Sequence, residues 1–286
     1  MAPRVSSYMQ DTVYIIRPTD SLARARNLML RRGIGRLVVI DDNERPIGIL
    51  TITDLTNALL GHYYSRPLDA IPVEKAMSKN IITIEPTKSI KTAAQLMLRF
   101  KIGGLPVVDP TGRLMGIITR TDIVKAYADR FTNKHTVEEL MRPAFAVANR
   151  GHSIYYLSKL IHMDPAGKII VVDKNNKPIG VITKRDLAFV TIPPAKRASR
   201  GKDRYVKIKV IDVYRDKIVP SRIYLVPTAE DIMTPDPVTI TKDKDAAEAA
   251  RLMVMEEIGV LPVVDEDGSL EGVLSKREIL LAVARS

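Results

Sequence analysis

GILTITD, at residues 48–54, recurs in altered form three times along this chain of 286 residues. The other copies are GIITRTD at 116–122, GVITKRD at 180–186 and GVLSKRE at 272–278. Each copy joins an apolar, strand-like stretch to a hydroxyl residue and an acidic residue. A fourfold recurrence of this kind indicates internal structural repeats.

A second motif precedes each heptapeptide. It is a short β-branched run that ends in an acidic residue: LVVID at 37–41, LPVVD at 105–109, IIVVD at 169–173 and LPVVD at 261–265. Turn-forming residues separate the two motifs in every copy, so each pair of motifs predicts a β-hairpin. The glycine of the heptapeptide is expected to open the second strand of that hairpin.

A helix and a further strand are expected before each hairpin. In the second copy Ile90, Ala93, Ala94, Met97 and Leu98 follow helical spacing, and residues 81–84 resemble a strand. The repeat order is therefore β, α, β, β, α. Units this short cannot bury a sheet face alone, so we expect them to pack in pairs.

The four glycines lie 68, 64 and 92 residues apart, so the last interval carries an insertion. The predicted fold class is α/β (α+β), with four βαββα repeats arranged as two tandem pairs. The expected boundaries are 1–66, 67–130, 131–190 and 227–286 for the repeats and 191–226 for a basic insertion.

On these motifs the chain resembles the four-repeat cystathionine-β-synthase (CBS) domain proteins, which are built as two tandem pairs called Bateman modules. It is similar to the nucleotide-sensing gamma subunit of AMP-activated protein kinase and to archaeal stand-alone CBS proteins. The resemblance implies a disc-like assembly with ligand clefts between paired repeats. It also implies AMP, ADP or ATP as the ligand, with no catalytic cofactor.

The hydroxyl and acidic residues of the heptapeptide admit two interpretations. Thr51 with Asp54, and the matching pairs in the other copies, fit a capping box at the start of a helix. The same geometry suits a nucleotide, because a helix N-terminus attracts phosphate and a carboxylate accepts ribose hydroxyls. By residue match, the resemblance assigns ribose and phosphate contacts to Thr51, Asp54, Thr119, Asp122, Thr183 and Asp186.

The fourth copy departs from the pattern, because Glu278 replaces the aspartate. Its longer side chain suits a capping box and would crowd a ribose. We therefore expect the fourth site to be empty or altered.

A second position in the family lies just before the middle strand, where a basic side chain reaches a phosphate held by the partner repeat. Its occupants here are Arg36, Gly104, Lys168 and Val260. Pairing of the first two repeats sets Arg36 against Thr119 and Asp122, whereas Lys168 would face Ser275 and Glu278. The alternative for Arg36 is a solvated arginine at a strand edge. Thr87, Ile102 and Gly103 match positions that form the adenine wall.

Composition excludes several functional classes. The chain has no cysteine, which removes disulfides, thiolate metal sites and cysteine nucleophiles. The four histidines lack metal-ligand spacing, and no nucleophile has a base beside it. We expect neither an enzyme nor a metal site. Without a signal segment or an apolar run of about 20 residues, the expected location is cytoplasmic and away from membranes.

Charge is unevenly distributed along the chain, whose formal net charge is +11. Residues 1–190 carry +11, residues 191–226 carry +7 and residues 227–286 carry −7. A basic field attracts polyanions, although a thermophile surface rich in Lys and Arg is the simpler interpretation. The insertion either covers the acidic fourth repeat or contacts RNA, and the sequence favours these two interpretations equally.

The residues available for polyanion contact in the insertion are Lys196, Arg197, Arg200, Lys202, Arg204, Tyr205, Lys207 and Lys209. We expect an exposed arm at the start of the insertion, and a β-hairpin from Tyr205 onward.

Two functional hypotheses follow. The first is an energy-state sensor that binds adenine nucleotides between paired repeats and acts on a partner protein. The second is a basic RNA-docking or ribosome-docking factor that restrains translation under stress, with or without nucleotide control. A homodimer is open under both hypotheses.

Overall fold

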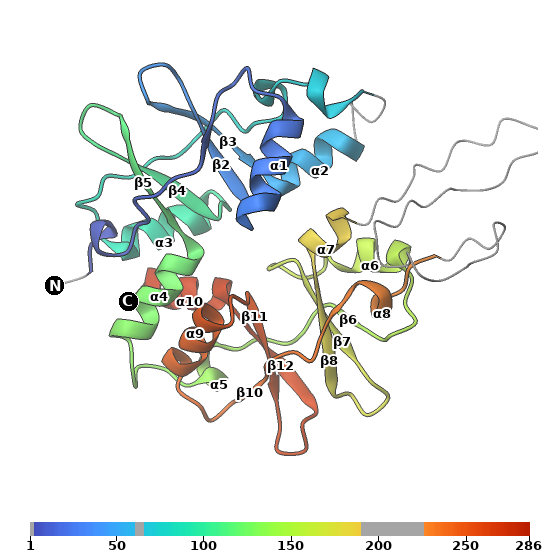
Figure 1. The fold of residues 1–286 in the computed structure, drawn as a ribbon. Helices are drawn as coiled ribbons and strands as arrows, with labels where there is room; N and C mark the ends of the chain where they lie inside the picture. Colours follow the sequence, from blue (N-terminus) through green and yellow to red (C-terminus); the bar gives the residue numbers. More distant parts are fainter. Residues whose placement is uncertain (1–2, 61–65, 190–225) are drawn as a thin grey trace, which may run out of the picture. The chain divides into compact units, whose positions relative to one another are not determined.

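The computed structural model describes residues 3–60, 66–189 and 226–286 (Figure 1). The chain forms two compact units. The first comprises Met1–Pro143, Thr239–Glu266 and Glu271–Ser286, and the second comprises Ala144–Val238 and Asp267–Leu270. The first unit thus holds the first and second repeats and most of the fourth, and the second unit holds most of the third. The predicted mixed α and β fold with four repeats is confirmed.

The first repeat shows the complete order of elements. Its sheet has the order β1-β2-β3, in which β1 runs parallel and β3 antiparallel to β2. The first helix is capped at its start by Ser21, whose side chain accepts a hydrogen bond from the Arg24 amide, and at its end by Gly33, which lies in the left-handed region. The elements are β1 (Ile15–Ile16), α1 (Leu22–Arg32), β2 (Arg36–Ile40), β3 (Pro46–Thr51) and α2 (Ile52–Leu60).

The other repeats follow the same plan with small differences. The second repeat has α3 (Ile90–Arg99), β4 (Gly104–Val108), β5 (Leu114–Thr119) and α4 (Arg120–Arg130). The third has α5 (Val137–Leu140), β6 (Val147–Ala148), α6 (Ile154–Leu160), β7 (Lys168–Val172), β8 (Pro178–Thr183) and α7 (Lys184–Phe189). The fourth has α8 (Ala229–Ile232), β9 (Thr234–Pro235), β10 (Ile240–Thr241), α9 (Ala246–Met255), β11 (Val260–Val264), β12 (Leu270–Ser275) and α10 (Lys276–Arg285). Short 3-10 helices η1 (Val5–Ser7), η2 (Leu68–Ala70) and η3 (Val73–Lys75) complete the first pair.

Two local expectations were wrong. The strand expected at residues 81–84 is reduced to one parallel bridge, between Ile84 and Val107. The heptapeptide glycine does not open its strand, because β3 begins at Pro46, two residues before Gly48. The predicted helix before the second hairpin is confirmed as α3.

In the first three repeats, the acidic residue directly after the first strand of the hairpin organises the turn. In the first repeat, Asp41 Oδ1 accepts hydrogen bonds from the amides of Asn43 and Arg45, at 2.9 and 2.8 Å. The fourth residue of the turn, Glu44, has a φ of 59°, and its equivalent in the second repeat is Gly112, with a φ of 84°. Glycine adopts the left-handed region without strain, whereas a residue with a side chain, such as Glu44, adopts it at an energetic cost. The same turn geometry is therefore less favourable in the first repeat than in the second.

Paired repeats exchange short segments. The segment Met77–Ser78, which leads into the second repeat, bonds to the hairpin of the first: the Ser78 amide donates to Ile49, and the Ile49 amide donates to Ser78. Gln10, which leads into the first repeat, makes the same two bonds with Ile117 of the second. We call Met9–Gln10, Met77–Ser78, Met141–Arg142 and Met233–Thr234 the exchanged segments. The last two bond in the same way to the fourth and third repeats respectively.

The exchanged segments explain the heptapeptide glycines. A Cβ on Gly116 would lie 2.8 Å from the Gln10 carbonyl oxygen, and one on Gly272 would lie 2.7 Å from that of Arg142. On Gly48, the Cβ would lie 2.6 Å from the Met77 sulfur. Any side chain here would push the exchanged segment off the hairpin, so glycine is required for close approach.

The paired first and second repeats also share apolar packing. Val38 and Ile40 of β2 cluster with Ile117 of β5, and all three are buried. A larger cluster of the first repeat includes Leu22, Leu37 and Leu50. Among the described residues, no helix is both long enough and apolar enough to span a membrane.

Replacement of Gly116 tests the close approach. Gly116→Ala is expected to lower the free energy of unfolding by about 2 kcal/mol, because its methyl group overlaps the Gln10 backbone. Guanidinium denaturation followed by circular dichroism measures this. Gly35→Ala is the matched control, since its Cβ would meet nothing nearer than 3.9 Å and the change should stay within about 0.5 kcal/mol. Equal effects of the two substitutions would contradict the explanation.

Candidate functional site

The hydroxyl and acidic residues of all four heptapeptides form capping boxes. The Thr119 amide and hydroxyl both donate to Asp122 Oδ2 at 2.7 Å. Thr51 with Asp54 and Thr183 with Asp186 repeat this arrangement at 2.6–2.8 Å. Ser275 donates in the same way to Glu278 Oε2. We call Asp54, Asp122, Asp186 and Glu278 the capping carboxylates.

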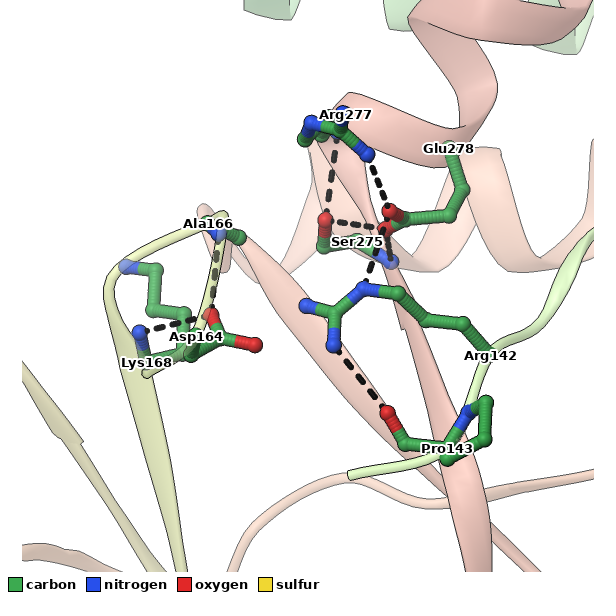
Figure 2. Close-up of polar contacts among 8 residues, drawn as sticks. All are labelled: Arg142, Pro143, Asp164, Ala166, Lys168, Ser275, Arg277 and Glu278. Atoms are coloured by element: carbon green, nitrogen blue, oxygen red, sulfur yellow. Dashed lines mark hydrogen bonds and ion pairs between the residues drawn. The ribbon is translucent and has the colours of Figure 1, made fainter. Parts of the chain in front are cut away.

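The second oxygen of each capping carboxylate distinguishes the four copies. Asp122 Oδ1 accepts a hydrogen bond of 2.8 Å from the Gln10 side-chain amide. Glu278 Oε1 accepts from Arg142 Nε at 3.0 Å and from Arg277 at 3.4 Å (Figure 2). Within the described part of the chain, the second oxygens of Asp54 and Asp186 have no hydrogen-bonding partner.

Burial follows the same division. Asp122 is 4% exposed and Glu278 is 5% exposed, whereas Asp54 and Asp186 are only partly buried. Both oxygens of Glu278 are thus taken, one by the capping box and the other by Arg142 and Arg277. Asp54 and Asp186 each keep one oxygen that has no partner among the described residues.

Arg36 reaches across from the first repeat to the second. Its backbone pairs with Thr51 within the first repeat, but its guanidinium lies against Gly103 and Gly104. A Cβ on Gly103 would lie 2.8 Å from Arg36 Nη2, and one on Gly104 would overlap Nη1. Gly104 occupies the same repeat position as Arg36, and its missing side chain gives the guanidinium room.

The charge of Arg36 lacks a fixed partner. Burial, together with the neighbouring charge of Arg120, lowers its pKa to about 10, and Asp122 opposes this shift. No hydrogen bond from its guanidinium to another described residue is formed. Arg36 therefore lies close enough to Asp122 for their charges to interact, and its contact with a phosphate stays a prediction.

Arg120 and Arg277 extend this cationic region. Arg120 Nη2 donates to the Ile102 carbonyl at 3.1 Å, while its buried Nε has no partner among the described residues. Burial and the charge of Arg277 lower the pKa of Arg120. We call Arg36, Arg120 and Arg277 the arginine cluster; one comes from each of the first, second and fourth repeats.

Lys168 lies in the second unit. Burial lowers its pKa, and the charges of Asp186 and Asp164 oppose the shift. Asp164 Oδ2 accepts hydrogen bonds from the amides of Ala166 and Lys168, both at 3.0 Å, which shapes the turn before β7 (Figure 2). The expected position of Lys168 opposite Ser275 and Glu278 stays a prediction.

The expected adenine wall is only partly accounted for. Thr87 is exposed, and its hydroxyl contacts Glu85 at 3.4 Å. Ile102 and Gly103 lie beside the guanidinium groups of Arg120 and Arg36 respectively. These two positions therefore border the arginine cluster, and their contact with a base stays a prediction.

The residues proposed for RNA contact, from Lys196 to Lys209, lie outside the described residues. The RNA-docking hypothesis therefore stays a prediction from charge alone. In the described part of the chain, no group of three or more His, Asp or Glu side chains is placed to hold a metal ion.

Four residues that the motifs did not single out contribute to the site: Gln10, Arg120, Arg142 and Arg277. Gln10 and Arg142 directly follow the methionine of an exchanged segment. A methionine recurs at positions 9, 77, 141 and 233, and this pattern could have identified the residue that follows it as an equivalent position in each repeat. Arg120 lies inside the heptapeptide, at a position that varies between copies.

The chain matches the family model of the CBS domain at residues 5–61, 73–129, 137–191 and 229–285. It is 24% identical over 283 residues to the uncharacterized protein MJ1225 of Methanocaldococcus jannaschii, covering 94% of this chain and 93% of that one. The crystal structure of MJ1225, described as a proposed archaeal homolog of g-AMPK, covers 98% of this chain and 99% of that chain with a TM-score of 0.73 at 22% identity.

Two further solved structures are similar to this chain. An uncharacterized conserved protein from Pyrococcus horikoshii has a TM-score of 0.66 at 18% identity, over 98% of this chain and 99% of that chain. CBSX2 of Arabidopsis thaliana, solved in complex with AMP, covers 44% of this chain and 97% of its own, with a TM-score of 0.39 at 28% identity.

The Arg142→Ala variant tests how much Arg142 offsets the unfavourable burial of the Glu278 carboxylate. The two side chains are 12% and 5% exposed, so Arg142→Ala leaves a buried carboxylate without its main cation and should lower the free energy of unfolding by about 3 kcal/mol. Guanidinium denaturation measures the change.

Arg150→Ala is the control for this prediction. It breaks an ion pair whose side chains are 54% and 57% exposed, and should cost less than about 1 kcal/mol. If the two variants lose the same stability, Glu278 is not held by Arg142 in the way described.

Proposed function

Because the chain belongs to the CBS domain family, we propose that it binds adenine nucleotides at the capping carboxylates Asp54, Asp122 and Asp186 and acts as a non-catalytic energy-state sensor for a partner. The fold and the family are common to many regulatory proteins, so the proposal rests on the site. The main observation in its support is that Asp122 lies near Arg36 and Arg120, neither of which forms an ion pair with another described residue.

Asp122 and the arginine cluster offer complementary groups. Asp122 is a hydrogen-bond acceptor suited to a ribose hydroxyl, provided that Gln10 gives way. Arg36 has no hydrogen-bonding partner among the described residues, and neither has Arg120 Nε. A partly buried cation without a counter-charge is unfavourable, and an anion that enters between the guanidinium groups relieves that cost.

A nucleotide carries both kinds of group at a fixed separation. Its ribose hydroxyls donate to a carboxylate, and its phosphate accepts from guanidinium groups, which bind phosphate with two parallel hydrogen bonds. The positive end of α4, which begins at Arg120, favours phosphate further. Asp54 and Asp186 provide the corresponding acceptor in the first and third repeats.

Sensing follows from the position of the ligand between repeats. Arg36 belongs to the first repeat and Asp122 to the second, so one nucleotide would touch both. Ligands that differ in phosphate number would engage the arginine cluster differently, and a partner that reads the arrangement of the repeats would respond to that difference.

Isothermal titration calorimetry with AMP tests the proposal. AMP carries one hydroxyl pair and one phosphate, which are the two groups that the site recognises. The ligand-stripped protein should give saturable heat, and Asp122→Ala should weaken at least one binding component by about tenfold, through loss of a hydrogen bond to a charged group. Asp129→Ala is the matched control, because it removes an exposed carboxylate from the same helix. Absence of any uptake at millimolar AMP would refute the proposal.

The Arg36→Met variant should be more stable than the wild type but should bind AMP more weakly. The pKa of Arg36 in the folded protein, about 10, lies below its ordinary value, so the charged side chain opposes folding at every pH below that value. Methionine fills similar space without charge, and the free energy of unfolding of ligand-free protein should rise by about 1 kcal/mol. AMP binding should weaken by about tenfold at the same time. A variant that is less stable and binds AMP unchanged would contradict both assignments.

A further inference from the structure

The residue after each exchanged methionine occupies one equivalent backbone position. We call Gln10, Ser78, Arg142 and Thr234 the lead residues. They pair with Ile117, Ile49, Val273 and Val181 respectively, which in every case is the residue directly after the heptapeptide glycine. Because the backbone register is the same four times, the lead residues differ only in their side chains.

Side-chain length decides what each lead residue reaches. Gln10 spans the distance to Asp122 and donates to its second oxygen at 2.8 Å. Arg142 does the same for Glu278 at 3.0 Å. Ser78 and Thr234 are too short, and no described side chain takes their place at Asp54 or Asp186.

We propose that the lead residue decides which capping carboxylate is free to accept the hydroxyls of a nucleotide. The inference rests on the proposed function and deepens it. Ser78 and Thr234 do not reach Asp54 and Asp186. Gln10 covers Asp122 but can be displaced by a ligand, whereas Arg142 blocks Glu278.

Gln10 is displaceable because little is lost when it leaves. It is an exposed, neutral side chain, and its amide donates the same kind of hydrogen bond to Asp122 that a ribose hydroxyl would donate. Ligand binding therefore exchanges one hydrogen bond for another, and Gln10 returns to water. Gln10 therefore weakens nucleotide binding at Asp122 without abolishing it.

Arg142 cannot leave as readily. Its ion pair with Glu278 is largely buried, and Arg277 also contacts the same oxygen (Figure 2). A ligand hydroxyl would replace a charged donor with a neutral one and break this largely buried ion pair, which is strongly unfavourable. The fourth copy is closed for this reason as well as for its longer acidic side chain.

Exchanging the lead residues of the first pair tests the inference. AMP is titrated calorimetrically into wild type, Gln10→Ser and Ser78→Gln, each also in an Asp54→Ala or Asp122→Ala background to assign the components. Gln10→Ser should strengthen, by about tenfold, the binding component that Asp122→Ala weakens. Ser78→Gln should weaken, by about the same factor, the binding component that Asp54→Ala weakens.

Ser78→Ala is the matched control, because alanine is also too short to reach Asp54 and should leave both components unchanged. Circular dichroism verifies that every variant is folded. If AMP binds but both components are the same in wild type, Gln10→Ser and Ser78→Gln, the inference is wrong and the proposed function stands. If no protein takes up AMP, the proposed function is wrong and the inference falls with it.

Discussion

The exchange of short segments between paired repeats is the constraint on which this structure depends. A hairpin edge has unpaired backbone groups, and burying them without partners is costly. Ser78 satisfies the edge at Ile49 and Gln10 satisfies the edge at Ile117, so each repeat of the first pair completes the other. A single repeat lacks this partner, which is the physical reason for building in pairs.

The same exchange brings functional groups together. It lays a lead residue beside the helix start of the sister repeat, where the capping carboxylate lies. It also requires glycine on the strand, because a Cβ on Gly116 would meet the Gln10 backbone at 2.8 Å. One interaction therefore sets both the packing of the pair and the surroundings of each candidate site.

Charge is used in two opposite ways in the first unit. The Arg142 and Glu278 pair is closed on itself, with a buried cation and a buried anion satisfying one another. In the arginine cluster burial lowers the pKa values of Arg36 and Arg120; the charge of Arg120 lowers that of Arg36 further, and the charge of Arg277 lowers that of Arg120. The Nε atom of Arg120 has no hydrogen-bonding partner among the described residues. Such an arrangement is unfavourable for folding, and it is typical of a site completed by an anion.

The sequence by itself determined the repeat, the hairpins and the capping boxes, because these depend on residues close together along the chain. Asp54 and its counterparts were recognised for that reason, and so was the departure at Glu278. Gln10 on Asp122 and Arg142 on Glu278 join residues more than a hundred positions apart, and only the tertiary structure decided them. The exchange of segments creates those contacts, and no local pattern encodes which repeat a segment will complete.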